Sequence, residues 1–145
     1  GQDWFAYADN YGTSEEKAFV AHFYTYIDRF RQVYQKVVLI RNERMFHLYS
    51  FEEGKRFEPD YVLILQRETD GGLEQIQVLI EPKGNHLLAE DAWKEAFLLS
   101  LEQNSVAVGG EEDGCVRHRI VGLHFFNEDT RKREFDQDLE NLLKL

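Results

Sequence analysis

The segment "RFEPDYVLILQRETDGGLEQIQVLIEPKG" (residues 56–84) decides the fold, because it contains a hairpin whose pairing can be counted. Asp70-Gly71 separates two segments rich in apolar residues, and Asp-Gly in that position is typical of a two-residue type I′ turn. We therefore expect strands at 60–66 and 74–83 that pair antiparallel across this turn.

The expected register brings three charged side chains to one face. Counting outward from the turn places Asp60 directly opposite Glu81, and directly opposed side chains share a face. Lys83, two residues beyond Glu81, lies on that face too. A turn at Gly71-Gly72 would put Asp60 opposite Lys83 and keep the three together, whereas a three-residue loop would separate them. The opposite face is apolar and consists of Tyr61, Leu63, Leu65, Ile76, Val78 and Ile80.

The charged face has the composition of a metal site. Two opposed carboxylates destabilise a sheet unless a cation lies between them. Oxygen ligands, a nearby ammonium and the lack of a Cys or His cluster favour a hard divalent cation such as Mg²⁺. Such an ion polarises a phosphoryl oxygen, and Lys83 could hold a water molecule or stabilise developing charge, as phosphodiester hydrolysis requires. The alternative is an ordinary cross-strand ion pair between Glu58 and Lys83.

Both prolines of the chain adjoin these acids. Pro59 imposes an extended entry just before Asp60. Pro82 cannot donate a hydrogen bond to a neighbouring strand, so we expect regular pairing to end there. The end of pairing leaves room for metal and substrate beside Glu81 and Lys83.

Hydrophobic periodicity predicts the elements around this hairpin. Residues 13–34 read as one helix, with a capping box of Thr13 and Glu16 and an apolar face of Phe19, Phe23, Tyr26 and Phe30. Further expected elements are strands at 36–42, 46–51 and 119–126, a helix from about residue 89 with Trp93, Ala96, Phe97 and Leu101 on one face, an acidic loop at 108–115, and a C-terminal helix with Phe135, Leu139 and Leu142 inward. This order predicts an α/β domain built around one mixed β-sheet.

Composition limits the classes of protein that the chain can represent. With 145 residues and 43% hydrophobic residues, it fits one globular domain spanning 1–145. The formal net charge of −10 argues against a domain that binds nucleic acid by electrostatics alone. No apolar run is long enough to span a membrane, and the single cysteine, Cys115, fits a reducing cytoplasm and is best interpreted as a spare thiol.

Pro59-Asp60 followed by Glu81-Pro82-Lys83 resembles the signature of the PD-(D/E)-x-K nuclease superfamily. The expected order of elements also resembles the restriction-endonuclease-like αβββαβ core of that superfamily. The segments "GTSEEKAFV", "YQKVVLIRNE", "FEEGKRFEPDYVLIL" and "LIEPKGNHLLAEDAWKEAFL" are similar to the C-terminal nuclease domain of the Res (restriction) subunit of type III restriction–modification enzymes. The resemblance covers most of the chain, residues 11–101.

The resemblance implies a role for each residue of the signature. Asp60 and Glu81 would bind Mg²⁺, for which Mn²⁺ can substitute. The backbone carbonyl of Pro82 would be a further ligand. Lys83 would position or activate the attacking water.

Other site residues are implied more loosely. Members of the superfamily often add a glutamate from the first helix, here Glu16 or Glu15, and the alternative for Glu16 is its role in the capping box. His86 and Lys94 would contact DNA or else be solvated surface residues. A phosphate-facing rim, or simply a balance for the acids, would consist of Arg41, Arg44, Lys55 and Arg56.

These expectations combine into a Mg²⁺-dependent DNA endonuclease domain taken from a larger, helicase-containing subunit in the bacterial cytoplasm. Its partners would be double-stranded DNA, the helicase/ATPase part of the same subunit, which would use ATP, and a modification methyltransferase subunit. Two alternatives stay open. One is another PD-(D/E)-x-K nuclease in DNA repair or defence, and the other is a non-catalytic protein-docking module of the same fold.

Overall fold

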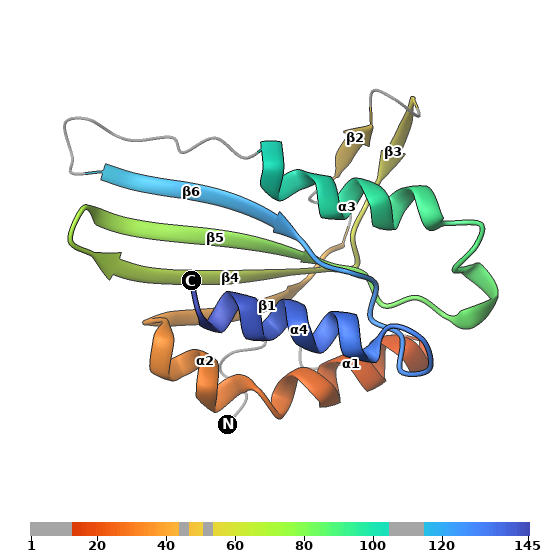
Figure 1. Ribbon diagram of the computed structural model, residues 1–145, viewed down its shortest axis with the longest axis horizontal. Coiled ribbons are helices and arrows are strands. Elements are labelled where there is room, and N and C mark those ends of the chain that lie inside the picture. The colour runs from red at the N-terminus through yellow and green to blue at the C-terminus, as the bar shows by residue number, and fades with distance from the viewer. Residues whose placement is uncertain (1–12, 44–46, 51–53, 105–114) are drawn as a thin grey trace.

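A computed structural model describes residues 13–43, 47–50, 54–104 and 115–145. Within them, one four-stranded mixed β-sheet lies between two layers of helices (Figure 1). The elements are α1 (Ser14–Tyr24), α2 (Ile27–Val33), β1 (Lys36–Arg41), β2 (Leu48–Ser50), β3 (Lys55–Phe57), β4 (Tyr61–Thr69), β5 (Gly72–Ile80), a 3₁₀ turn (Asn85–Leu87), α3 (Ala92–Asn104), β6 (Cys115–Gly122) and α4 (Lys132–Leu143). The predicted α/β class and the mixed sheet flanked by helices are confirmed.

The sheet has the order β1-β4-β5-β6. The first three of these strands are antiparallel neighbours, while β6 runs parallel to β5 after the chain has crossed over through α3. A parallel neighbour needs such a crossover, because a tight turn can join only antiparallel strands. The short strands β2 and β3 form a separate hairpin, of which only β2 was predicted.

The register of the β4–β5 hairpin is the one counted from the sequence. Thr69 pairs with Gly72, and Tyr61 pairs with Ile80 at the far end. The predicted turn type is wrong, since a type I′ turn needs positive φ at both turn residues and the positive φ (+122°) falls instead on Gly72. The loop nevertheless contains two residues, so every side chain of the hairpin lies on the predicted face of the sheet.

Each face of the sheet has its own core. The face covered by α1, α2 and α4 is the predicted apolar one, and all six of its β4 and β5 residues are at most 3% exposed. The other face is covered by α3 and the β2–β3 hairpin, with Val62 and Leu79 of the sheet packed beneath Leu98 (Figure 1). Asp60, Glu81 and Lys83 continue this second face by strand alternation.

The predicted helix 13–34 is two helices. Thr25 ends α1: its N–H and its hydroxyl both donate to the carbonyl of His22, at 3.1 and 2.6 Å. Such i→i−3 bonds tighten and end a helix, because they use the carbonyl that the next turn would need. The apolar face persists across the break, since Phe19, Phe23 and Phe30 are all fully buried.

Several predicted boundaries move. The strand predicted at 74–83 ends at Ile80, and the one predicted at 119–126 runs from Cys115 to Gly122. Most of the predicted loop 108–115 lies outside the described residues. In α3, Leu98 is fully buried whereas Ala96 is exposed, so the inward face is rotated from the predicted one.

The C-terminal helix matches its prediction, with Phe135, Leu139 and Leu142 buried on the inner side of α4. Across the described residues, no helix combines the length and the apolar character that crossing a membrane requires.

Candidate active site

Three charged residues meet at the end of the sheet where β4 begins and β5 ends. The backbone N–H of Asp60 donates to Oε1 of Glu81 at 2.9 Å, which places the two residues opposite each other as predicted. Nζ of Lys83 lies 3.1 Å from Oε2 of Glu81. The predicted trio Asp60, Glu81 and Lys83 is therefore brought together. Glu81 and Lys83 are buried, at 5% and 8% exposed, and Asp60 is half-buried.

Pro82 shapes the backbone between Glu81 and Lys83. The Glu81 carbonyl accepts from the N–H of Phe126, and the Lys83 N–H donates to the Phe126 carbonyl, both at 3.0 Å. These bonds make an isolated parallel bridge between Pro82 and Phe126, beyond the end of β5. Because successive carbonyls of an extended chain alternate in direction, the Pro82 carbonyl points away from Phe126, toward the side of Asp60. The missing N–H of proline falls on that same side.

The first helix contributes a second buried carboxylate beside that of Glu81. Glu16 is 7% exposed and accepts from the N–H of Thr13 at 3.0 Å, so the predicted capping box is present. Its other oxygen lies 3.4 Å from Nε of Arg41. Glu15 instead points toward Gly84, where its Oε1 would be 3.1 Å from an added Cβ. Of the two glutamates, Glu16 is the one whose charge acts on Asp60.

Burial and mutual repulsion control the protonation of the acids. The pKa of Asp60 is raised to about 8 by burial first and then by the charges of Glu81 and Glu16, partly offset by Lys83 and Arg41. Burial also raises the pKa of Glu81, although Lys83 and the N–H of Asp60 oppose that rise. A carboxyl group such as that of Asp60, which holds its proton at neutral pH, is one whose ionised form an added cation would stabilise.

The donor set fits a hard divalent cation. Three carboxylates (Glu16, Asp60 and Glu81) face two cations (Arg41 and Lys83), which leaves an excess of negative charge when all are ionised. Oxygen donors and net negative charge are what Mg²⁺ requires. Among the residues that the structure describes, no three His, Cys, Asp or Glu side chains are already gathered for an ion. Instead, Lys83 forms an ion pair with Glu81, and Arg41 forms one with Glu16.

Lys83 has a second carboxylate partner that the sequence interpretation missed. Its Nζ lies 2.7 Å from Oδ2 of Asp91, just before α3. Burial lowers the pKa of Lys83, but the hydrogen bonds with Asp91 and Glu81 outweigh it and leave the pKa raised. Lys83 is therefore a protonated donor at neutral pH. An Asp at the start of a helix reads as a helix cap, and no spacing rule links it to a lysine eight positions earlier.

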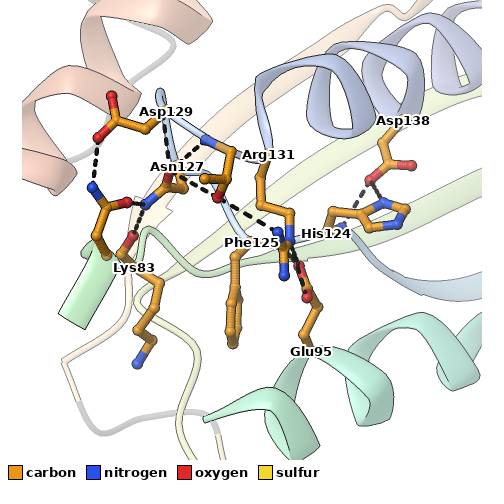
Figure 2. A network of polar contacts seen from close by, with 10 residues as sticks. Lys83, Glu95, His124, Phe125, Asn127, Asp129, Arg131 and Asp138 are labelled. Carbon is orange, nitrogen blue, oxygen red and sulfur yellow. Dashed lines mark hydrogen bonds and ion pairs between the residues drawn. The ribbon is translucent and has the colours of Figure 1, made fainter. Parts of the chain in front are cut away.

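A network of polar contacts holds the backbone of Lys83 from behind (Figure 2). Nδ2 of Asn127, which is 4% exposed, donates to the Lys83 carbonyl at 2.9 Å and to Oδ1 of Asn85 at 2.7 Å. Its Oδ1 accepts from the N–H of Thr130 at 2.9 Å. Nearby, Glu95 accepts from the N–H of Phe125 and from Arg131. None of these contacts was predicted, because each joins segments at least 30 residues apart or depends on a loop without periodicity.

The predicted DNA contacts lie at different depths. Lys94 is half-buried, with its Nζ 3.6 Å from Oδ1 of Asp91 and 5.6 Å from the ring centre of Phe57. His86 is exposed on the 3₁₀ turn after Lys83. Trp93 packs into the second core, as its interpretation as a core residue required.

The predicted basic rim is divided. Lys55 and Arg56 are exposed on β3, whereas Arg41 faces Glu16, and Arg44 lies outside the described residues. Glu58 lies 3.5 Å from Arg56. The alternative Glu58–Lys83 pair is wrong, since Lys83 is held by two other acids.

Residues 1–143 match the family model HI_1054_C, which is described as a C-terminal domain. The chain belongs to this family. An uncharacterized protein of Haemophilus influenzae (strain ATCC 51907 / DSM 11121 / KW20 / Rd) is 32% identical over 142 residues, covering 93% of the chain. The chain spans about a third of that relative, 31% of its length. No solved structure matches this member of the HI_1054_C family.

Proposed function

We propose that this HI_1054_C domain is a Mg²⁺-dependent DNA endonuclease domain of the PD-(D/E)-x-K type. The observation that carries the proposal is the pair of opposed residues Asp60 and Glu81 at the ends of neighbouring strands, with Lys83 on the same face. The order of elements supports a restriction-endonuclease-like αβββαβ core. A helical segment precedes three antiparallel strands, and a helix then leads to a parallel fourth strand.

Each residue of the site would have a distinct task. Asp60, Glu81 and the Pro82 carbonyl would hold the ion, with Glu16 as a further donor. When bound, Mg²⁺ supplies Lewis acidity that polarises the phosphoryl group and lowers the pKa of coordinated water. Lys83, as a protonated donor, would hydrogen bond to the attacking water or to the negative oxygen that develops at phosphorus.

Substrate and partners follow from the same proposal. His86, on the 3₁₀ turn that follows Lys83, and Lys94, in the first turn of α3, would contact the phosphates of double-stranded DNA. We propose the parent to be a type III Res subunit, with a helicase/ATPase part that uses ATP and a methyltransferase partner that supplies recognition. The greater length of the Haemophilus influenzae relative is compatible with additional parts in such a protein.

Cleavage of supercoiled plasmid DNA tests the activity. The wild-type chain with Mg²⁺ or Mn²⁺ should nick the plasmid, and Asp60→Ala and Lys83→Ala should each lower the rate by about 100-fold or more, because each removes transition-state stabilisation. The matched controls are Glu68→Ala and Lys36→Ala, which change exposed residues of the same sheet. Equal cleavage by Asp60→Ala and the wild type would refute the proposal.

Calorimetric titration tests the metal site separately from cleavage. Mg²⁺ or Mn²⁺ should bind the wild type and Lys83→Ala but not Asp60→Ala, because of these two residues only Asp60 is a proposed ligand. No binding to the wild type at millimolar concentration would contradict the proposed site, whatever the plasmid assay shows.

A further inference from the structure

Two carboxylates from different parts of the chain share the ammonium of Lys83. Glu81 belongs to the same extended segment, and its Oε2 lies 3.1 Å from Nζ. Asp91 follows the 3₁₀ turn, and its Oδ2 lies closer, at 2.7 Å. The lysine is therefore held by one carboxylate before and one after the 3₁₀ turn, which the proposed chemistry does not by itself explain.

Glu81 cannot serve Lys83 and a divalent ion in the same way. Its Oε1 already accepts from the N–H of Asp60, so Oε2 is the oxygen that faces Lys83. An ammonium and a divalent cation repel each other at a shared oxygen. If Glu81 becomes a ligand, Lys83, which is only 8% exposed in this structure, would lose part of this contact. A buried ammonium without a carboxylate partner is unstable, so Lys83 needs a second partner to stay in place.

Asp91 is built to retain Lys83 at that moment. Its backbone N–H donates to the Leu87 carbonyl at 2.9 Å, and its carbonyl accepts from the Lys94 N–H at 2.9 Å, which fixes the residue at the start of α3. Nζ of Lys94 lies 3.6 Å from Oδ1, on the other oxygen. The backbone of Asp91 and its Oδ1 are thus held by other partners, and Oδ2 is the oxygen that contacts Lys83.

Asp91 is also kept ionised. Burial raises the pKa of Asp91, but the hydrogen bond with Lys83 and the charges of Lys83 and Lys94 outweigh burial and leave the pKa lowered. The side chains of Asp91 and Lys83 are 15% and 9% exposed, so the pair is poorly screened by solvent.

We propose that Asp91 is a positioning residue that holds the Lys83 ammonium directed at the reacting phosphate when Glu81 turns to the metal ion. Asp91 itself touches neither the ion nor the substrate. The inference rests on the proposed function, because it assigns Asp91 a task within that same site.

Steady-state cleavage of plasmid DNA with Mg²⁺ tests this assignment. Asp91→Asn keeps the shape but not the charge, so kcat should fall about 10- to 100-fold, while KM for DNA and the Mg²⁺ affinity measured by calorimetry change less than twofold. Asp91→Glu, which restores a carboxylate, should recover most of kcat. The matched control is Glu90→Gln, an exposed neighbour that should behave as the wild type.

One cleavage result and one calorimetric result would each overturn the assignment. An unchanged kcat in Asp91→Asn would show that Glu81 alone suffices for Lys83. Loss of Mg²⁺ binding in a folded Asp91→Asn would make Asp91 a ligand instead of a positioning residue.

A measurement on Lys83 itself separates this inference from the proposed function. With Mg²⁺ added, ¹⁵N NMR should show a Lys83 ammonium that exchanges protons with water slowly in the wild type and at least about tenfold faster in Asp91→Asn. Equal exchange in both would overturn the positioning role even if the DNA is cleaved. If the exchange rates differ as expected but the chain cleaves no DNA, the role of Asp91 in holding Lys83 is supported and the proposed nuclease function is contradicted.

Discussion

Asp60 shows how far the properties of one residue depend on what surrounds it. Its place opposite Glu81 can be counted from a turn ten residues away. Its protonation cannot, because that depends on burial and on Glu16, which reaches the site from α1. A carboxyl group with a pKa near 8 lacks enough positive charge around it to stay ionised at neutral pH, and such groups are common at functional sites.

Stability should depend on pH through this carboxyl group. Its pKa rises from the ordinary 3.8 to about 8 on folding, so between these values the folded chain binds more protons than the unfolded chain. Stability is then lost as pH rises from about 4 to about 8. Without divalent metal, Asp60→Asn should lack this loss. Its free energy of unfolding in urea, relative to that of the wild type, should increase between pH 5 and pH 8. A stability difference that is the same at both pH values would contradict the raised pKa.

At the scale of secondary-structure elements, the packing of α3 against the sheet depends on one glycine. A Cβ added to Gly122 of β6 would lie 2.2 Å from the backbone carbonyl oxygen of Leu98. Backbone atoms cannot move aside as a flexible side chain can, so helix and strand approach this closely only because the side chain is absent. The same helix begins directly after Asp91, so the packing of α3 against β6 also affects the position of the carboxylate that contacts Lys83.

Gly122→Ala should therefore separate α3 from β6. We expect a loss of about 3 kcal/mol or more in the free energy of unfolding, at or above the upper end for overpacking. Gly71→Ala is the matched control: nothing lies within 4 Å of its added Cβ, and a change within about 0.5 kcal/mol is expected. Urea denaturation of both variants checks this, and similar midpoints would show that α3 packs less closely than described.

At the scale of the whole molecule, the site lies where the two helical layers meet the end of one sheet. Glu16 comes from the α1 side, Asp91 from the α3 side, and Asp60 and Glu81 from the sheet between them. A ligand at this junction would contact segments from distant parts of the chain. Its binding should therefore stabilise the whole fold against unfolding.

Mg²⁺ should raise the melting temperature of the wild type beyond any effect of ionic strength. At ten times its Kd, a bound ligand adds about 1.4 kcal/mol, or about 3–5 °C for a domain of this size. The net charge of −10 means that any salt relieves repulsion to some extent, so the control is NaCl at matched ionic strength. Asp60→Asn should show no excess shift with Mg²⁺. An equal shift with NaCl would mean that the chain has no Mg²⁺ site.

The sequence by itself determined the hairpin, its register and the meeting of Asp60, Glu81 and Lys83. Strand alternation and a two-residue loop are local rules, and together they carry the facing of each side chain over twenty positions. The capping box of Thr13 and Glu16 was predictable for the same reason, since it needs only four consecutive residues.

Only the tertiary structure decided the approach of α3 to Gly122 and the partners of Lys83. Asp91, Asn127 and Glu16 reach the trio across turns and layers whose packing no local rule predicts. Their effect on charge also depends on burial, because water screens the same groups when they are exposed. Local sequence rules thus predict the positions of the reacting groups, while contacts with residues distant in the sequence set their protonation and orientation.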